Sequence, residues 1–128
     1  MLNSGTTIHP ALGTVRTADG VTLAELAGEL DLASAPALRE QLLGLLRPGF
    51  SRLVLDLSRV SFCDASGLAV LVGTGRRARL LGGFLRLAAV PPQVNRVLRL
   101  TGLHQHLPIF PTVWAATSAP GPGHARAA

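Results

Sequence analysis

The amino-acid sequence predicts a single α/β domain, and three observations lead to that prediction. Apolar runs typical of strands alternate with segments that have the 3–4 spacing of amphipathic helices. An Asp19-Gly20 pair between the first two strand-like runs is typical of a hairpin turn. With 128 residues, 48% of them hydrophobic, the chain is long enough for one core and too short for two. We therefore expect a mixed β-sheet of about four to five strands that begins with a hairpin and alternates with helices packed on it.

The N-terminal part of the domain is predicted from its turn and alternation signals. Residues 1–12 are expected to form a flexible lead-in, and a strand is expected to begin at Gly13. After the hairpin turn, residues 21–30 alternate between the two faces of a half-buried strand. One face carries Ala24, Leu26, Gly28 and Leu30, and the other carries Glu25, Ala27 and Glu29.

The middle of the chain is predicted to form a helix, a strand and a second helix. Ser34 is predicted to cap a helix with Pro36 in its first turn, and Pro48-Gly49 follows its end. Its apolar stripe is formed by Leu38, Leu42, Leu45 and Leu46. Residues 53–57 are predicted to form an inner strand, and residues 58–61 a polar connector. The segment after Ser66 has strand-like and helix-like features, and its 3–4 apolar spacing favours a helix.

The remaining elements are shorter. Residues 84–90 are predicted to form a strand, and a short helix starts at Pro91-Pro92 and ends before Gly102. A proline-marked edge strand is expected over residues 107–113. Residues 114–128 are expected to be a disordered tail, because they are mostly small residues, proline and glycine. The predicted domain therefore covers residues 13–113.

Ser66 is the main candidate for a functional residue. It follows a buried strand and a tight turn, Asp64-Ala65-Ser66-Gly67, which places it near the N-terminus of a helix. Free backbone N–H groups and the helix dipole favour negative charge there, so a hydroxyl at this point suits phosphorylation. The alternative is that Ser66 only caps the helix. Use as a hydrolase nucleophile is disfavoured, because Gly-x-Ser-x-Gly is absent and nothing marks His104 or His106 as a base.

Two aspartates and a cysteine lie near this turn. Asp64 either caps the helix or helps to orient a phosphoryl donor or the acceptor hydroxyl. Asp31 ends a strand at the same predicted edge of the sheet, or only starts a turn. Cys63 is expected to be a buried apolar thiol and not a redox sensor. One cysteine and two closely spaced histidines give no metal site, so no metal or cofactor is predicted.

The charge of the chain is unevenly distributed. All seven acidic residues lie at or before Asp64, and seven arginines follow it. This basic half is expected to be a solvated face or a surface for an acidic partner, and no motif supports nucleic-acid binding. No apolar run reaches the length of a membrane span, and no secretion signal is evident, so we expect a cytoplasmic protein that does not bind membranes.

These residues, taken together, resemble the bacterial anti-sigma factor antagonists, which are built on the STAS domain. The matching blocks occur in family order: Gly28-Glu29-Leu30-Asp31, the helix after Ser34, the strand over residues 53–57, the turn around Ser66, and the segment 97–103. The similarity covers about residues 14–113. The Asp-x-Ser-Gly-Leu turn alone is a weak signal, but it becomes specific in this order with the other blocks.

The resemblance implies a partner-switching mechanism. The partner would be an anti-sigma factor that is also a serine kinase of the histidine-kinase-like ATPase class. The unphosphorylated antagonist would bind it and free a sigma factor, phosphorylation of Ser66 would cause release, and a PP2C-type phosphatase would reset the cycle. The chain would not be an enzyme. The resemblance assigns partner binding to Asp31, Asp64, Ala65, Gly67 and Leu68.

One departure and one alternative accompany this resemblance. Ala65 stands where many relatives carry Ser or Thr, which leaves Ser66 as the sole hydroxyl of the turn. STAS domains also occur as non-catalytic adaptor subunits of signalling scaffolds and transporter ATPase complexes. The presence of Ser66 favours the antagonist, because an adaptor needs no phosphoacceptor.

Overall fold

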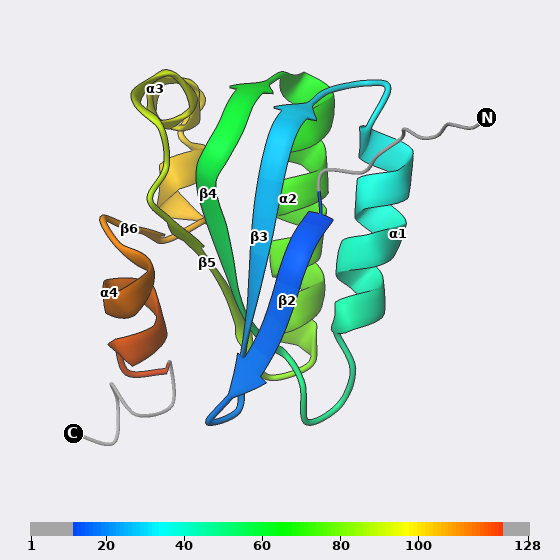
Figure 1. Cartoon of the computed structure of the whole chain (residues 1–128), viewed down its shortest axis with the longest axis vertical. Helices are drawn as coiled ribbons and strands as arrows, with labels where there is room; N and C mark the ends of the chain where they lie inside the picture. Colours follow the sequence, from blue (N-terminus) through cyan, green and yellow to red (C-terminus); the bar gives the residue numbers. More distant parts are fainter. Residues whose placement is uncertain (1–11, 122–128) are drawn as a thin grey trace.

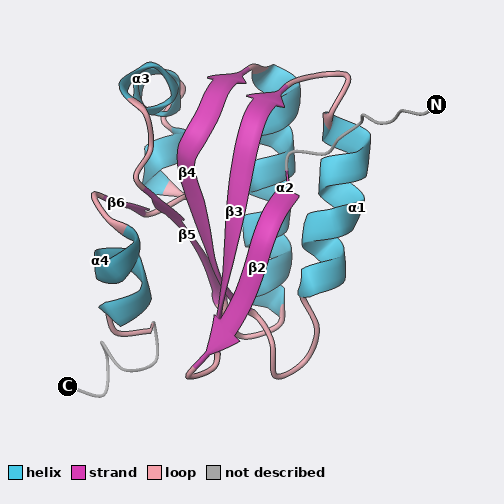
Figure 2. Cartoon of the chain, in the orientation of Figure 1, coloured by secondary structure: helices cyan, strands magenta, loops and turns pink. Residues whose placement is uncertain are grey.

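A five-stranded sheet forms the centre of the computed structural model, which describes residues 12–121 (Figures 1 and 2). The strands are β2 (Leu12–Ala18), β3 (Val21–Leu30), β4 (Arg52–Cys63), β5 (Phe84–Ala88) and β6 (Ile109–Phe110), and they lie in this order across the sheet. The hairpin pair β2–β3 is antiparallel, whereas the other neighbouring pairs are parallel. The predicted α/β class, the mixed sheet and the N-terminal hairpin are confirmed.

The hairpin turn follows directly from its two residues. Asp19 and Gly20 both have positive φ, 54° and 79°, which is the backbone geometry of a two-residue type I′ connection. Aspartate tolerates this conformation better than most residues, and glycine adopts it without steric cost. The first part of the predicted lead-in, residues 1–11, lies outside the described residues.

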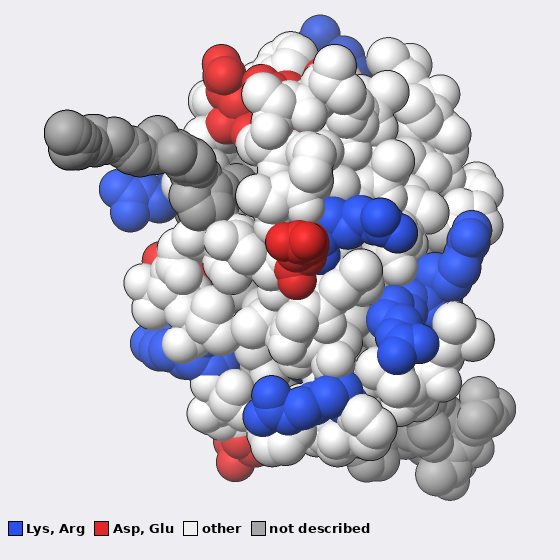
Figure 3. All heavy atoms as spheres, turned by 90° about the vertical axis from the view of Figure 1, so that its right-hand side faces the viewer, with Lys and Arg blue, Asp and Glu red and all other residues white. Residues whose placement is uncertain are grey.

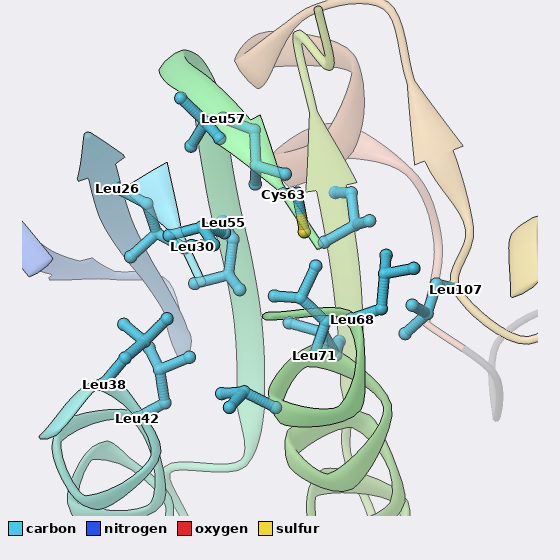
Figure 4. Packing of buried hydrophobic residues seen from close by; sticks show 14 of the residues in the cluster. Leu26, Leu30, Leu38, Leu42, Leu55, Leu57, Cys63, Leu68, Leu71 and Leu107 are labelled. Carbon is cyan, nitrogen blue, oxygen red and sulfur yellow. The ribbon is translucent and has the colours of Figure 1, made fainter. Parts of the chain in front are cut away.

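Among residues 12–121, four α-helices pack on the sheet: α1 (Ala35–Leu45), α2 (Ala65–Leu80), α3 (Pro92–Leu100) and α4 (Val113–Ser118). Helices α1 and α2 cover one face of the sheet (Figure 1), where they bury the main hydrophobic core. That core is dominated by leucines from β3, β4 and the two helices, and Figure 4 shows Leu26, Leu55, Leu38 and Leu71 pointing into the same space. At about 1.5–3 kcal/mol for each fully buried leucine, this layer supplies most of the hydrophobic stabilisation.

Three sequence predictions about element limits were wrong. Residues 58–61 are not a connector, because β4 continues to Cys63. Its pairing with β3 shifts register twice and continues as far as Leu30 and Cys63. The last strand covers only Ile109–Phe110 and not residues 107–113. The start of the predicted disordered tail is helical, since Val113–Ser118 form α4, while residues 122–128 lie outside the described part of the chain.

Helix α4 covers part of the second face of the sheet. Its Ala116 is buried against Val54, Phe84 and Ala88. The side chain of Arg86, only 5% exposed, holds this helix on the sheet. Its guanidinium donates hydrogen bonds to the backbone carbonyl oxygens of Ala116 and Ala119, both at 2.8 Å, and of Pro120.

The Arg86 guanidinium also lies over two aromatic rings, 3.8 Å from the Phe84 centroid and 5.4 Å from that of Phe110. The negative end of the α4 dipole and three carbonyl oxygens take the place of a carboxylate partner for this charge. Burial, and then the nearby charge of Arg52, lower the pKa of Arg86 from its usual value.

Candidate functional site

The candidate site lies where the parallel strands β3 and β4 end, at the upper edge of the sheet in Figure 1. Leu30 and Cys63 are paired at the ends of these strands, and Asp31 and Asp64 follow them directly. The two aspartates therefore lie at one edge of the sheet, as the sequence predicted. The backbone N–H of Asp64 donates to the carbonyl oxygen of Leu30 at 3.1 Å, which joins the two strand ends.

Asp64, and not Ser66, caps helix α2. Its Oδ1 accepts hydrogen bonds from the backbone N–H groups of Ser66 at 2.8 Å and Gly67 at 3.1 Å. This arrangement satisfies two of the N–H groups that a helix start leaves unpaired, and it places negative charge at the positive end of the dipole. Of the two interpretations left open for Asp64, helix capping is the one that the structure shows.

Ser66 is consequently free of a capping role. It is the second residue of α2 and is half-buried, and its hydroxyl makes no hydrogen bond to any residue in the range 12–121. Of its two neighbours, Ala65 is exposed and Gly67 is buried. Modification of this hydroxyl would therefore break no hydrogen bond among the described residues.

Gly67 allows the turn to approach β3. A Cβ atom at this position would lie 2.3 Å from the carbonyl oxygen of Leu30 and 2.7 Å from its Cβ. No larger residue fits without moving α2 away from the strand. Leu68 is only 6% exposed and belongs to the core, so its side chain anchors the first turn of the helix. Partner binding by these two residues stays a prediction.

The loop after β3 is held by a small hydrogen-bond network around Asp31. Asp31 Oδ1 accepts from the Ser34 backbone N–H at 3.0 Å, and the Ser34 hydroxyl accepts from the Asp31 N–H at 3.0 Å. Ser34 Oγ also donates to the Glu29 carbonyl oxygen at 2.8 Å. Ser34 is the N-cap residue of α1, as predicted, but its hydroxyl bonds back to the loop and makes no side-chain hydrogen bond to the helix start.

Two exposed apolar side chains near this edge were missed as candidate residues. Leu32, in the loop after β3, is 75% exposed, and Phe62, near the end of β4, is 48% exposed. Residues of this type are more often buried, so their exposure at this edge of the sheet is typical of a contact surface. Phe62 stood in a recognisable motif, but its exposure depends on the extension of β4 to Cys63, which the sequence did not indicate.

A shallow apolar cavity of about 440 Å³ lies along α2. It includes two of the residues predicted to bind a partner, Ala65 and Leu68. The other lining residues are Ala69, Val72, Gly73, Arg76, Thr101 and Leu103. A partner segment seated here would contact the turn and the exposed side of α2 at the same time.

Cys63 lies beneath the site as a buried thiol, 7% exposed, which confirms that prediction. Burial, and to a lesser extent the charge of Asp64, raise the pKa of Cys63 to about 11. The thiol is therefore protonated at neutral pH and poorly nucleophilic.

In the described part of the chain, neither His104 nor His106 is hydrogen-bonded to Ser66. His104 Nδ1 is 3.4 Å from the Leu98 carbonyl oxygen. Among residues 12–121 no three His, Cys, Asp or Glu side chains are grouped as metal ligands. On the side that carries α1, basic side chains occupy separate places and form no continuous patch (Figure 3). Within the described range, no helix is both long and apolar enough to cross a membrane.

The strand order and the capped serine turn define the class of the protein: a small α/β domain with a candidate site at the ends of its parallel strands. Residues 14–116 match the STAS domain family, and the chain belongs to that family. The predicted domain end at residue 113 lies three residues before the end of this match.

Individual relatives carry related names. The chain is 41% identical over 78 residues to the "Anti-sigma-B factor antagonist" of Bacillus subtilis, covering 61% of this chain and 71% of the relative. It is 34% identical over 92 residues to the "Anti-sigma F factor antagonist" of Paenibacillus polymyxa, covering 71% of this chain and 79% of the relative. The crystal structure of an anti-sigma factor antagonist from Mycobacterium paratuberculosis superimposes with a TM-score of 0.74 at 32% identity. The superposition covers 82% of this chain and 89% of that structure.

A further structural neighbour supports the fold alone. It is SpoIIAA, described as a Bacillus cell fate determinant and solved in its phosphorylated form, with a TM-score of 0.64 at 21% identity. It covers 84% of this chain and 96% of its own.

Proposed function

We propose that this chain is an anti-sigma factor antagonist that is switched by phosphorylation of Ser66. The single observation that carries the proposal is the position of the Ser66 hydroxyl, which is unbonded at the second residue of α2 while Asp64 fulfils the capping role. The names of the relatives support the same function. In this role the chain binds and is modified, and it catalyses no reaction itself.

The partner that fits this role is an anti-sigma factor with serine kinase activity of the histidine-kinase-like ATPase class. The unphosphorylated chain binds it through the edge around Asp31, Asp64 and Ala65, and through the cavity along α2, and so frees a sigma factor. The kinase transfers the γ-phosphoryl group of ATP to Ser66 Oγ, which loses its proton, and ADP leaves. A PP2C-type phosphatase hydrolyses the phosphoserine and restores the binding form. Because the cycle needs ATP and a sigma factor, we place it in the cytoplasm.

The electrostatics of the turn explain how one phosphate reverses binding. Phosphoserine adds about −1.5 to −2 charge. Within the domain, the N-terminus of α2 tolerates this charge, so the fold is kept. At the interface the phosphate joins Asp31 and Asp64 in one negative region, and a partner surface must then desolvate or expel it. A penalty of roughly 3–4 kcal/mol weakens binding on the order of several hundred-fold.

The test is a phosphorylation assay with the cognate kinase and ATP. Trypsin should release the peptide of residues 60–76, which contains Ser61, Ser66 and Thr74, so fragmentation must assign the site. Thr74 is buried and donates to the Val70 carbonyl oxygen, which makes it a poor acceptor. We expect one phosphate, on Ser66, and none on the Ser66→Ala protein. The exposed Ser61→Ala protein is the matched control and should be labelled like the wild type.

The same variants test the switch in binding. Ser66→Ala should fold, bind the anti-sigma factor and resist release, which gives constitutive sigma-dependent transcription. Ser66→Asp carries less charge than phosphoserine and should bind weakly but mimic it incompletely. Equal labelling of wild type and Ser66→Ala would refute the switch and leave the adaptor function as the better explanation.

A further inference from the structure

A second and larger cavity lies on the opposite face of the sheet from α1 and α2, far from the Ser66 turn. Its volume is about 850 Å³, within the range of cavities that hold small ligands. The N-terminal ends of β3, β4 and β5 form its floor, and α4 with the residues after it forms one wall. The lining residues are Arg16, Thr17, Ala18, Asp19, Val21, Leu23, Arg52, Phe84, Val113, Trp114 and residues 117–121.

The pairing of the strands explains why arginines and apolar residues meet here. Residues paired across neighbouring strands carry their side chains on the same face. One row across the sheet runs Ala18, Val21, Arg52 and Phe84. The next row runs Arg16, Leu23, Val54 and Arg86. The face therefore combines apolar side chains with three arginines in adjacent rows.

The two outer arginines lack the partners that surface arginines commonly have. Within residues 12–121, neither Arg16 nor Arg52 has a hydrogen bond or a carboxylate ion pair within 4.0 Å, and both are exposed at the rim. Arg86 lies deeper, and its guanidinium is occupied by the carbonyl oxygens at the end of α4. Asp19 is the one acidic residue among the lining residues, so the cavity keeps a net positive charge.

Trp114 adds a second feature that suits a ligand. Its ring is 76% exposed although it lines the cavity, which is unusual for a large aromatic residue on a folded domain. Together with Val21, Leu23 and Phe84 it forms an apolar surface next to the two free guanidinium groups. The apolar part of a ligand bound on this surface is shielded from water, while an anionic group at the end of the same ligand reaches the guanidinium groups of the two arginines.

We propose that this cavity binds a small soluble anionic amphiphile, with a carboxylate, sulfate or phosphate head at Arg16 and Arg52 and an apolar body between Trp114 and the floor of Val21, Leu23 and Phe84. The site is separate from the Ser66 edge and does not depend on the function proposed for it.

The experiment uses the full chain and three probes of equal chain length: decanoate, decyl sulfate and decyltrimethylammonium. Trp114 is the only tryptophan, so its fluorescence reports directly on this cavity, and calorimetry gives the affinity. We expect the two anions to bind and to change the fluorescence, and the cation to bind at least tenfold more weakly. Shortening the chain from decanoate to octanoate should weaken binding by roughly fifteenfold, because each of the two buried methylenes that are lost contributes about fourfold. Acetate and inorganic phosphate, which lack the apolar body, should not bind measurably.

Variants connect binding to the named residues. Arg16→Gln with Arg52→Gln should weaken decanoate binding by about three- to twentyfold, the range expected for two exposed ion pairs. Arg96→Gln with Arg99→Gln removes the same charge from the exposed side of α3 and should leave the affinity unchanged. Asp19→Asn should tighten binding and keep the hairpin, because Asn-Gly is a favoured type I′ turn.

Three results would overturn the proposal. One is that the cation binds as tightly as the anions, which would indicate hydrophobic adsorption. Another is that both double variants weaken binding equally, which would indicate an effect of net charge. The third is that binding occurs without a change in Trp114 fluorescence, which would place the ligand elsewhere. Circular dichroism and thermal melting of each variant would verify folding, which these exposed side chains should not disturb.

Discussion

The buried thiol of Cys63 makes the stability of this protein depend on pH in the alkaline range. The chain contains no lysine and no tyrosine, the side chains that ordinarily titrate near pH 10. Burial raises the pKa of Cys63 from 9.0 to about 11. Between these two values the unfolded thiol loses its proton and the folded thiol keeps it. The unfolded state then binds fewer protons, so the free energy of unfolding falls as pH rises from about 9 to 11.

The size of this effect follows from the shift. A change of one pKa unit corresponds to about 1.4 kcal/mol, so a loss of about 2–3 kcal/mol is expected by pH 11. Urea unfolding at pH 8, 9, 10 and 11 would measure it. The Cys63→Ala protein, although less stable at pH 8 because of the lost packing, should show a flat profile over the same range. Parallel profiles of the two proteins would refute the reasoning, since the pH dependence would then come from other groups.

Three further predictions follow from packing and charge. Gly67→Ala should lower the free energy of unfolding by about 1–3 kcal/mol, because the new Cβ clashes with β3. Gly73→Ala should raise it by about 0.5–1 kcal/mol, because Gly73 lies in α2 with open space around it. Urea unfolding of the two variants measures both changes. Arg86→Met should cost about 2–4 kcal/mol and release α4, seen as a change in Trp114 fluorescence before global unfolding. Asp31→Asn keeps an oxygen that can accept the hydrogen bond from the Ser34 N–H, so the melting temperature should shift by only a few degrees. Phosphorylation of Ser66 should nevertheless be reduced. A large loss of stability with normal phosphorylation would contradict a site role for Asp31.

The local signals of the sequence were sufficient for most of the fold. Alternation, caps and the Asp19-Gly20 turn depend on neighbours in the chain, and the elements that they predicted are present. The end of β4 was missed because its strict alternation is lost there: Val60 and Cys63 are buried, but Ser58, Arg59 and Ser61 are exposed. Backbone pairing with β3 continues through two irregularities in register, and such pairing leaves no signal in the sequence.

Helix α4 was missed for a different reason. Its sequence of small residues has little amphipathic pattern, and the contact that holds it comes from Arg86, about 30 residues earlier in the chain. A buried arginine in a strand cannot be recognised from spacing alone, because its partners are backbone carbonyl groups. For the candidate site, the sequence predicted the turn and its two aspartates. It could not decide between Ser66 and Asp64 as the cap, since that depends on which oxygen reaches the free N–H groups.

The hydrogen bond from Asp64 N–H to the Leu30 carbonyl oxygen has a consequence for the speed of the proposed switch. Together with the close approach of Gly67 to β3, it ties the turn to the strand, so we expect the backbone of the turn to stay in place when Ser66 gains or loses a phosphate. The proposed cycle would then contain no slow refolding step. The response time of the cell to a stimulus would then be set by the turnover of the kinase and the phosphatase and by the dissociation of the partner, and the antagonist itself would add no delay.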